Sequence, residues 1–89
     1  MSFQLDQNTL RMRVRFSNFA DAFAFMSEVA ALAESHNHHP DWRNIYNLVD
    51  ISLTTHDAGN QVTEKDLKLA SDIEQLASLR SAEVLPFEG

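Results

Sequence analysis

Residues 10–16 restrict the possible folds of this chain more than any other stretch. In this run Leu, Met, Val and Phe alternate strictly with three arginines. Alternation with a period of two is typical of a β-strand that buries one face and leaves the other in water. The chain is therefore expected to contain a sheet with one covered face and one wet face.

Three further segments are expected to complete this sheet. Residues 49–56 alternate in the same way and predict a second one-sided strand that ends at His56. Residues 3–5 predict a short edge strand before a turn at residues 6–8, and residues 44–46 predict another short strand. Asp50 would share the wet face with the arginines. A solvated face or ion pairs across strands, in a chain that is acidic as a whole, is a better interpretation of the arginines than an anion-binding or RNA-binding surface.

The segment after residues 10–16 predicts a helix with an unusually wide apolar surface. Ser17 or Asn18 can cap this helix, and the helix dipole favours Asp21 in its first turn. Its apolar residues cover more of the circumference than an ordinary amphipathic helix needs. We expect the helix to pack on the sheet and also against another subunit. The apolar residues are Phe19, Ala22, Phe23, Phe25, Met26, Val29, Ala30, Leu32 and Ala33.

A second helix is predicted to begin after Thr63. With Thr63 as its N-cap, Asp66 occupies the third helical position and approximates a capping box. Val62 and Leu67 would form a hydrophobic staple around the same helix start. The apolar stripe that follows is narrower and consists of Leu69, Ile73 and Leu76.

The segments follow one another in the order strand, strand, helix, strand, strand, helix. This order predicts an α+β fold, a two-layer sandwich in which a four-stranded antiparallel sheet carries two helices on one face. The length of 89 residues and the lack of a linker or internal repeat predict one domain over residues 1–89. The tail, residues 81–89, contains Pro86 and is expected to lie along the surface.

The composition excludes several classes of protein. The chain has no cysteine, so neither disulfides nor thiolate zinc sites are possible. Its formal net charge of −6 weighs against nucleic-acid binding, which needs clustered lysine and arginine. The sequence contains no signal peptide and no apolar run long enough to span a membrane. We therefore expect a cytoplasmic protein that binds neither nucleic acid nor membrane.

Three of the four histidines fall within one short segment, at His36, His38 and His39. Histidine titrates near neutral pH, so such a cluster suggests proton transfer or metal binding. Pro40 disfavours the helical region for the residue before it and holds that residue extended or in a turn. The segment therefore predicts a non-helical loop that presents imidazole rings.

The residue types leave three interpretations of this cluster open. A metal site, completed by Glu34 or Asp66, has only a weak signal, because the spacing matches neither a zinc finger nor the helical His-Glu-x-x-His pattern. Acid–base catalysis without a metal is the simplest use of the set. In the third interpretation the loop histidines are ordinary polar residues, His56 is only a strand end and Asp66 is only a helix cap.

The spacing of these residues favours one interpretation. The chain places Glu34, His38-His39-Pro40, Tyr46, His56 and Asp66 at separations of three, five, nine and nine residues. This pattern resembles the signature of the pterin-4a-carbinolamine dehydratases, also called 4a-hydroxytetrahydrobiopterin dehydratases. The likeness runs from about residue 10 to residue 76 and combines several separated motifs in the right order, which makes it specific.

The resemblance implies a lyase that removes water from a 4a-hydroxytetrahydropterin and yields the quinonoid dihydropterin for tetrahydrobiopterin recycling. Members of the family act without a metal or other cofactor, alongside aromatic amino-acid hydroxylases. They share the two-layer fold and assemble as homodimers or homotetramers, which suits the wide apolar surface of the first helix. The leaving hydroxyl needs a proton and a ring N–H must lose one, and groups that titrate near neutrality can do both.

Carried over by position, the resemblance assigns a role to nine residues. His38 and His56 are the candidates for acid and base, and the division between them stays open. His39 is expected to hold the pterin, and Asp66 to orient or polarise a histidine. The expected substrate-binding residues are Glu34 and Lys65 at the polar rim, Pro40 and Trp42 as walls of the ring site, and Thr55 as a further contact to the ring.

Two other functions remain open alongside the dehydratase. One is a non-catalytic interaction protein that keeps the fold and uses the first helix to bind a partner. The other is a protein of the dehydratase fold that acts in molybdenum-cofactor (molybdopterin) metabolism. A complete set of His38, His39, His56 and Asp66 argues against the first of these, because a scaffold does not need it.

The sequence departs from the family pattern in two places. Residues 59–62 make the segment between His56 and Asp66 one residue longer than in many relatives. We expect the loop to absorb this residue, because the cap at Thr63 anchors Asp66 at the helix start. The chain also starts close to its first strand, without the leading helix of animal members, which double as dimerisation cofactors of a homeodomain transcription factor. The sequence therefore gives no support for that transcriptional role and does not decide it.

Overall fold

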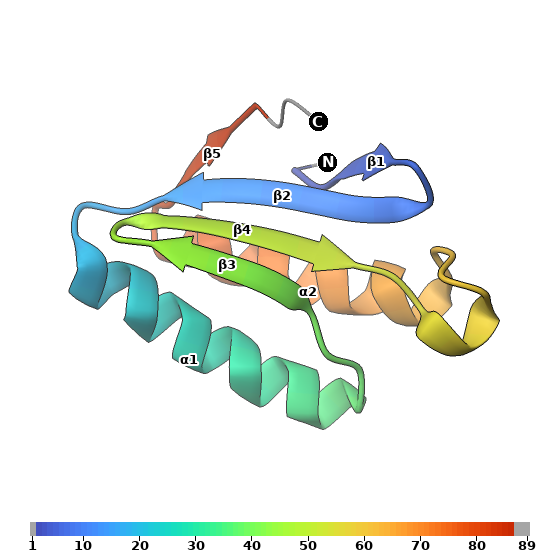
Figure 1. The fold of residues 1–89 in the computed structure, drawn as a ribbon. Coiled ribbons are helices and arrows are strands. Elements are labelled where there is room, and N and C mark those ends of the chain that lie inside the picture. Colours follow the sequence, from blue (N-terminus) through green and yellow to red (C-terminus); the bar gives the residue numbers. More distant parts are fainter. Residues whose placement is uncertain (1, 87–89) are drawn as a thin grey trace.

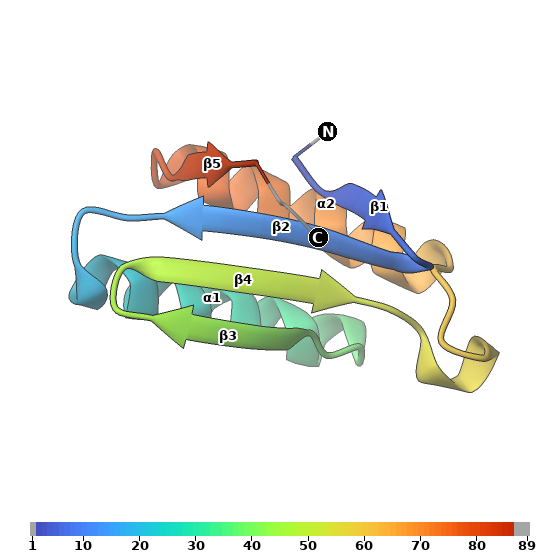
Figure 2. The ribbon, with the colours of Figure 1, turned by 45° about the horizontal axis from the view of Figure 1, so that its top comes forward.

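Both helices lie on one face of an antiparallel sheet in the computed structural model, which describes residues 2–86 (Figures 1 and 2). This arrangement confirms the predicted α+β two-layer fold. In chain order the elements are β1 (Gln4–Asp6), β2 (Thr9–Arg15), α1 (Phe19–His36), β3 (Asp41–Ile45), β4 (Leu48–Leu53), the 3₁₀ turn η1 (His56–Ala58), α2 (Glu64–Leu79) and β5 (Glu83–Leu85).

The sheet has the order β1-β2-β4-β3, and β5 adds a fifth strand beside β2. β2 pairs antiparallel with β4, from Leu10 opposite Leu53 to Arg15 opposite Leu48. β5 pairs with the C-terminal half of β2. The sequence predicted four strands, because three residues are too few to establish an alternating pattern in the tail. Residues 87–89 of that tail lie outside the described residues.

The hairpin of β3 and β4 differs in its boundaries from the prediction. β3 begins at Asp41, earlier than the predicted segment 44–46. β4 ends at Leu53 and not at His56. The backbone instead forms an isolated bridge between Thr55 and Gln61, and His56 opens the turn η1. The prediction that His56 ends a strand is therefore wrong, because the chain has already left the β4 ladder.

The covered face of the sheet and the inner faces of both helices form the core. The alternating residues of β2 point inward as predicted, and Met12 and Val14 have almost no solvent exposure. Phe16 at the end of β2 contacts Phe25 of α1, with ring centroids 4.9 Å apart. The buried helix residues are Ala22, Phe25, Val29 and Ala33 of α1, and Asp66, Leu69, Ala70, Ile73 and Ala77 of α2.

Part of the wide apolar surface of α1 stays outside this core. Phe19 and Phe23 are 48% and 55% exposed, and their rings stack on each other with centroids 5.9 Å apart. Packing against the sheet therefore accounts for only part of the apolar side chains of α1. Within residues 2–86, neither helix combines the length and the apolar character that crossing a membrane requires.

Capping fixes the two helix ends that border the histidine segment. Asn37 ends α1 in the left-handed conformation, with φ 50° and ψ 41°, which asparagine tolerates better than most residues. The backbone N–H of His38 then donates to the carbonyl of Ala33 at 3.0 Å. At the other border, α2 begins after Thr63 with the predicted capping box to Asp66. The chain therefore leaves α1 and enters α2 at defined positions.

The open face of the sheet carries the arginines of β2. Arg13 lies directly opposite Asp50 of β4, and its Nε donates to Asp50 Oδ1 at 2.6 Å. Arg15 pairs with Glu83 of β5 at 2.7 Å. Of the two arrangements predicted for the arginines, a solvated face or cross-strand ion pairs, Arg13 and Arg15 form the ion pairs.

Candidate active site

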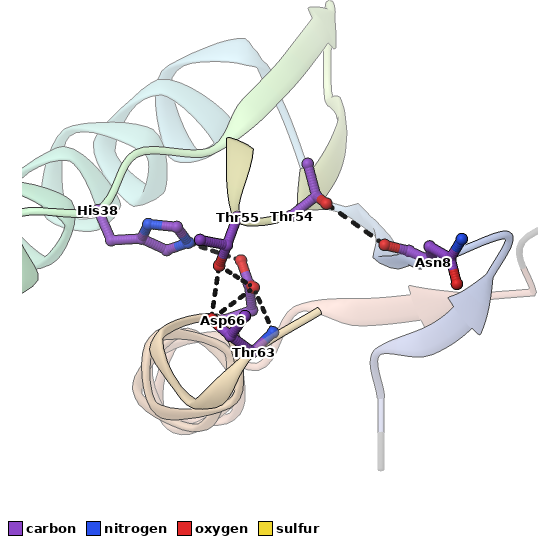
Figure 3. A network of polar contacts seen from close by, with 6 residues as sticks. All are labelled: Asn8, His38, Thr54, Thr55, Thr63 and Asp66. Atoms are coloured by element: carbon purple, nitrogen blue, oxygen red, sulfur yellow. Dashed lines mark hydrogen bonds and ion pairs between the residues drawn. The ribbon is translucent and has the colours of Figure 1, made fainter. Parts of the chain in front are cut away.

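His38 and Asp66 form a buried contact between the loop after α1 and the first turn of α2. Nε2 of His38 lies 2.6 Å from Oδ1 of Asp66 (Figure 3). The Asp66 side chain has no solvent exposure and that of His38 is 11% exposed. Twenty-eight residues separate the two in sequence, and the capped ends of the two helices bring them together.

The second carboxylate oxygen of Asp66 also accepts hydrogen bonds. Oδ2 accepts a hydrogen bond from the Thr55 hydroxyl at 2.6 Å and another from the Thr63 backbone N–H at 2.8 Å. The hydroxyl oxygens of Thr55 and Thr63 lie 2.6 Å apart. Figure 3 shows Thr55, Thr63 and His38 converging on Asp66 from the segment after β4, the start of α2 and the loop after α1. The buried carboxylate therefore has donors on both of its oxygens.

These contacts determine the charge of Asp66. Burial by itself would raise the pKa of this carboxyl group, because it disfavours the charged form. The hydrogen bonds from Thr55, His38 and the Thr63 N–H, together with the charge on His38, outweigh burial and hold the pKa of Asp66 below its ordinary value of 3.8. Asp66 is therefore ionised at neutral pH and can only accept hydrogen bonds.

A surface cavity of about 310 Å³ opens beside this pair. It collects side chains from the loop after α1, the end of β4, the turn η1 and the first turn of α2. Asp66 lies behind the cavity wall, in contact with His38. The lining residues are Asn37, His38, His39, Thr54, Thr55, His56, Asp57 and Lys65. Five of the nine predicted site residues are among them.

His39 and Glu34 form a second histidine–carboxylate pair at the rim. Nε2 of His39 lies 2.6 Å from Oε2 of Glu34. The side chains are 59% and 77% exposed, so the pair is largely in water. Glu34 does not line the cavity and reaches it through His39.

His56 stands on the turn that follows β4. Its Nδ1 lies 3.1 Å from the side-chain oxygen of Asn60. Gly59 and Asn60 both adopt positive φ, 76° and 58°, and reverse the chain toward α2. The longer loop is absorbed in this turn, as expected, because Asp66 stays within hydrogen-bond distance of His38.

Pro40 and Trp42 lie away from the lining of the cavity. Pro40 immediately precedes β3, and Trp42 lies on β3 opposite Ile51, where it packs against the core. Their role as walls of a ring site therefore stays a prediction from the sequence. Thr55, predicted to contact the ring, lines the cavity, and its hydroxyl donates to Asp66.

The three histidines of the segment do not converge on a common point. His36 contacts Asp72 of α2 at 2.7 Å, and each of the other two contacts a different carboxylate. Over residues 2–86, no group of three histidine, aspartate or glutamate side chains is arranged to hold a metal ion. What the arrangement offers is a set of proton donors and acceptors around one cavity.

Four groups at the site have no predicted role there: the Thr63 hydroxyl, Asn37, Thr54 and Asp57. The sequence predicts Thr63 only as a helix cap, although a cap at the start of a helix can also support a neighbouring carboxylate. Asn37 ends α1 in the left-handed conformation, and asparagine is one of the residues that favour this position. Asp57 directly follows His56, but nothing in its spacing distinguishes it from a turn residue.

Sequence comparison places the chain among pterin dehydratases. The family model described as "Pterin 4 alpha carbinolamine dehydratase" matches residues 2–76. A Prochlorococcus marinus protein named "Putative pterin-4-alpha-carbinolamine dehydratase" is 52% identical over 75 residues, which cover 84% of this chain and 78% of the relative. A Rhizobium rhizogenes protein of the same name is 47% identical, over 85% of this chain and 74% of its own length.

Solved structures with the same fold carry more than one description. A structure from Brucella melitensis, described as a transcriptional coactivator/pterin dehydratase, has a TM-score of 0.80 and 38% identity over 85% of this chain and 82% of that one. Another, described as a pterin dehydratase-like protein and RuBisCO assembly factor in the alpha-carboxysome, has a TM-score of 0.68 and 26% identity, over 84% of this chain and 86% of that one.

Proposed function

The chain belongs to the pterin-4a-carbinolamine dehydratase family, and we propose that it is a hydro-lyase that removes water from 4a-hydroxytetrahydropterin to give quinonoid dihydropterin. The observation that carries this proposal is the buried His38–Asp66 pair at the wall of a cavity that His39 and His56 also line. Such a set provides groups that both donate and accept protons around one bound molecule.

The chemistry of the reaction explains the need for these groups. The hydroxyl leaves a carbon that is bonded to a ring nitrogen, and the lone pair of that nitrogen expels it. The leaving oxygen takes up a proton and departs as water, while a ring N–H loses a proton to a base. A positioned acid or base typically accelerates such a step about a hundredfold or more. Two positioned imidazoles are therefore well suited to the reaction.

Within the proposal, His38 and His56 exchange protons with the substrate and His39 holds the pterin. Asp66 orients His38 and stabilises its protonated form, since an ionised carboxylate lies against Nε2. Lys65 and Glu34 supply polar contacts at the rim. A volume of about 310 Å³ lies at the lower end of the range for small-molecule sites. It suits a bicyclic ring better than a larger cofactor.

A stopped-flow assay with the carbinolamine generated in situ tests this function. We expect the wild-type protein to accelerate dehydration far above the spontaneous rate. His36→Ala is a matched control, because His36 pairs with Asp72 outside the cavity, and it should retain the wild-type rate. A wild-type rate equal to the spontaneous rate would remove the dehydratase function.

The proposal includes catalysis without a metal or other cofactor. Protonation of the leaving hydroxyl by one imidazole, its expulsion by the ring nitrogen and loss of the ring N–H proton to a second imidazole complete the reaction without a further group. We therefore predict that prolonged treatment with a metal chelator leaves the dehydration rate unchanged. A rate that falls on chelation and returns with one particular divalent metal would overturn this part of the proposal.

The proposal also extends to the setting of the enzyme. It would act in the cytoplasm as a homodimer or homotetramer and serve an aromatic amino-acid hydroxylase by recycling its tetrahydropterin. The exposed, stacked Phe19 and Phe23 support an association of subunits, because such rings are seldom left in water. Light scattering at micromolar concentration would report the assembly, and a monomeric mass would contradict it.

A second candidate is a non-catalytic assembly or interaction protein. It is favoured by the structural similarity to the RuBisCO assembly factor and by the exposed aromatic rings of α1. The dehydratase is better supported, because the similarity to the structure described as a coactivator/pterin dehydratase is higher in both identity and TM-score. A role on another pterin, as in molybdopterin metabolism, would appear in the same assay as turnover of that pterin alone.

A further inference from the structure

The hydrogen-bond chain behind His38 has a defined direction. The ionised Asp66 carboxylate has no hydrogen to give, so the Thr55 hydroxyl must donate to Oδ2 across their 2.6 Å contact. A hydroxyl has one hydrogen, and that of Thr55 is then used. In the 2.6 Å contact between the two threonines, Thr63 must therefore donate and Thr55 must accept.

Competing contacts do not disturb this direction. The Thr63 hydroxyl also lies 3.5 Å from Asp66 Oδ2, which is too long to rival its 2.6 Å contact with Thr55. Thr55 is only 7% exposed and Asp66 is fully buried, so water does not compete strongly for these groups. Hydrogen bonds that follow one another in a poorly solvated place strengthen each other.

The same reasoning fixes the proton on His38. Nε2 faces an acceptor-only carboxylate and must carry a hydrogen. The other ring nitrogen, Nδ1, has no hydrogen-bond partner among residues 2–86, and Figure 3 shows it on the side of the ring away from Asp66. In the neutral ring Nδ1 is therefore the nitrogen free to accept a proton.

We propose that Thr55, supported by Thr63, is a positioning residue that holds the Asp66 carboxylate against Nε2 of His38, so that His38 exchanges protons through Nδ1. This inference rests on the dehydratase function proposed above and adds to it. Thr55 acts on the reaction through Asp66 and His38 rather than by touching the substrate. Its hydroxyl, and not its methyl group, is the part that matters.

Removal of the hydroxyl has a definite consequence for Asp66. In Thr55→Val the side chain keeps its size, but Oδ2 retains only the Thr63 N–H as a close donor. The charged carboxylate then loses part of its compensation for burial, so its pKa should rise. His38 should be held less firmly, because the carboxylate can turn toward other donors.

The experiment compares Thr55→Val with Thr55→Ser, Thr63→Val and the control Thr9→Val. Thr9 starts β2, opposite Asp6 of β1, and does not line the cavity. For Thr55→Val we expect about tenfold lower kcat with little change in KM, the effect of losing one hydrogen bond to a charged group. Thr55→Ser should restore the rate to within about twofold, since it keeps the hydroxyl. Thr63→Val should have an intermediate effect, and Thr9→Val none.

Carbon-13 titration of the Asp66 carboxyl measures its pKa, which would not change if Thr55 had only a structural role. Its pKa should be higher in Thr55→Val than in wild type and return in Thr55→Ser. The double variant Thr55→Val/Asp66→Asn should be no slower than Asp66→Asn alone, because both changes act through one group. An unchanged Asp66 titration in Thr55→Val, or losses that multiply in the double variant, would overturn the proposal.

Two further outcomes are informative. If Thr55→Val does not fold, Thr55→Ala removes the same hydroxyl and must raise the pKa of Asp66 in the same way. If the wild-type protein has no dehydratase activity, the proposed function fails. The titration of Asp66 and the nitrogen-15 shifts of His38, which should report hydrogen on Nε2, would then still decide whether the threonines position this pair.

Discussion

Two histidine–carboxylate pairs lie side by side in this molecule and share the same contact distance. His38 and Asp66 are 2.6 Å apart, and so are His39 and Glu34. Their surroundings differ. The first pair is 11% and 0% exposed, whereas the second is 59% and 77% exposed. Within residues 2–86, only the carboxylate of the first pair is supported by further donors, from Thr55 and Thr63.

The comparison teaches that distance alone does not define a catalytic pair. Water competes for both members of an exposed pair, and such contacts typically contribute at most about 1 kcal/mol. In a buried pair the loss of one partner leaves a charge without compensation, at a cost of about 3–5 kcal/mol. The adjacent histidines of one sequence motif can therefore differ widely in what their partners do for them.

Between the two pairs, the largest expected effect is that of Asp66→Asn on catalysis. Asparagine keeps the shape of the side chain but has only one oxygen. The Thr63 backbone N–H can only donate and holds that oxygen on its side, so the amide NH2 faces His38 and no longer fixes a hydrogen on Nε2. We predict a fall in kcat of about a hundredfold or more, the size of one acid–base contribution. The stopped-flow assay measures it. A fall of less than threefold would mean that burial and threonine support do not distinguish this pair.

The same substitution should also change stability in a way that depends on pH. The pKa of Asp66 is lowered in the folded protein, so its stabilisation is fully present above the ordinary value of 3.8 and is lost as pH falls below it through the folded value. We predict that Asp66→Asn lowers the free energy of unfolding by about 3 kcal/mol at pH 7. This difference should shrink below about pH 4.

Urea unfolding at pH 7, 5 and 3 measures this dependence. Asp50→Asn is a useful reference, because Asp50 is a carboxylate paired with Arg13 on the open face of the sheet. A difference between wild type and Asp66→Asn that is the same at all three pH values would contradict the assigned charge of Asp66.

The smallest effect is expected at the exposed pair. Glu34→Gln should change the free energy of unfolding by less than about 1 kcal/mol, because water already solvates both partners. Its effect on kcat/KM should stay below about tenfold, since a rim contact adds binding but moves no proton. The assay used for Asp66→Asn applies unchanged. If Glu34→Gln were as damaging as Asp66→Asn, the contrast between the two pairs would be wrong.

The fold could be predicted where the sequence carries a long periodic or capping signal. Residues 10–16 form β2 because seven alternating positions leave little ambiguity, and Thr63 starts α2 because cap, box and staple agree. β5 was missed because its stability comes from pairing with β2 across the chain, which a three-residue segment does not reveal. The end of β4 was misplaced because alternation continues past Leu53 although the ladder stops there.

The sequence could predict which residues belong to the site, but not their contacts or their burial. The spacing selected His38, His39 and His56, the family resemblance added Lys65, and the structure gathers all four at one cavity. It could not reveal that the Thr55 hydroxyl faces Asp66, since this depends on the path of the loop between Thr55 and α2. Nor could the spacing show that His38 belongs to a buried pair and the next residue, His39, to an exposed one. The burial of the His38 pair is set by α2, which carries Asp66.

The central claim is that His38 and His56 move the protons of one bound pterin. The most direct test is the dehydration rate of His38→Ala, His56→Ala and the double variant, each with its fold verified by circular dichroism. We predict that each single variant loses about a hundredfold or more in kcat and that the double variant approaches the spontaneous rate. A single variant that turns over at the wild-type rate would exclude that histidine from the reaction and contradict the claim.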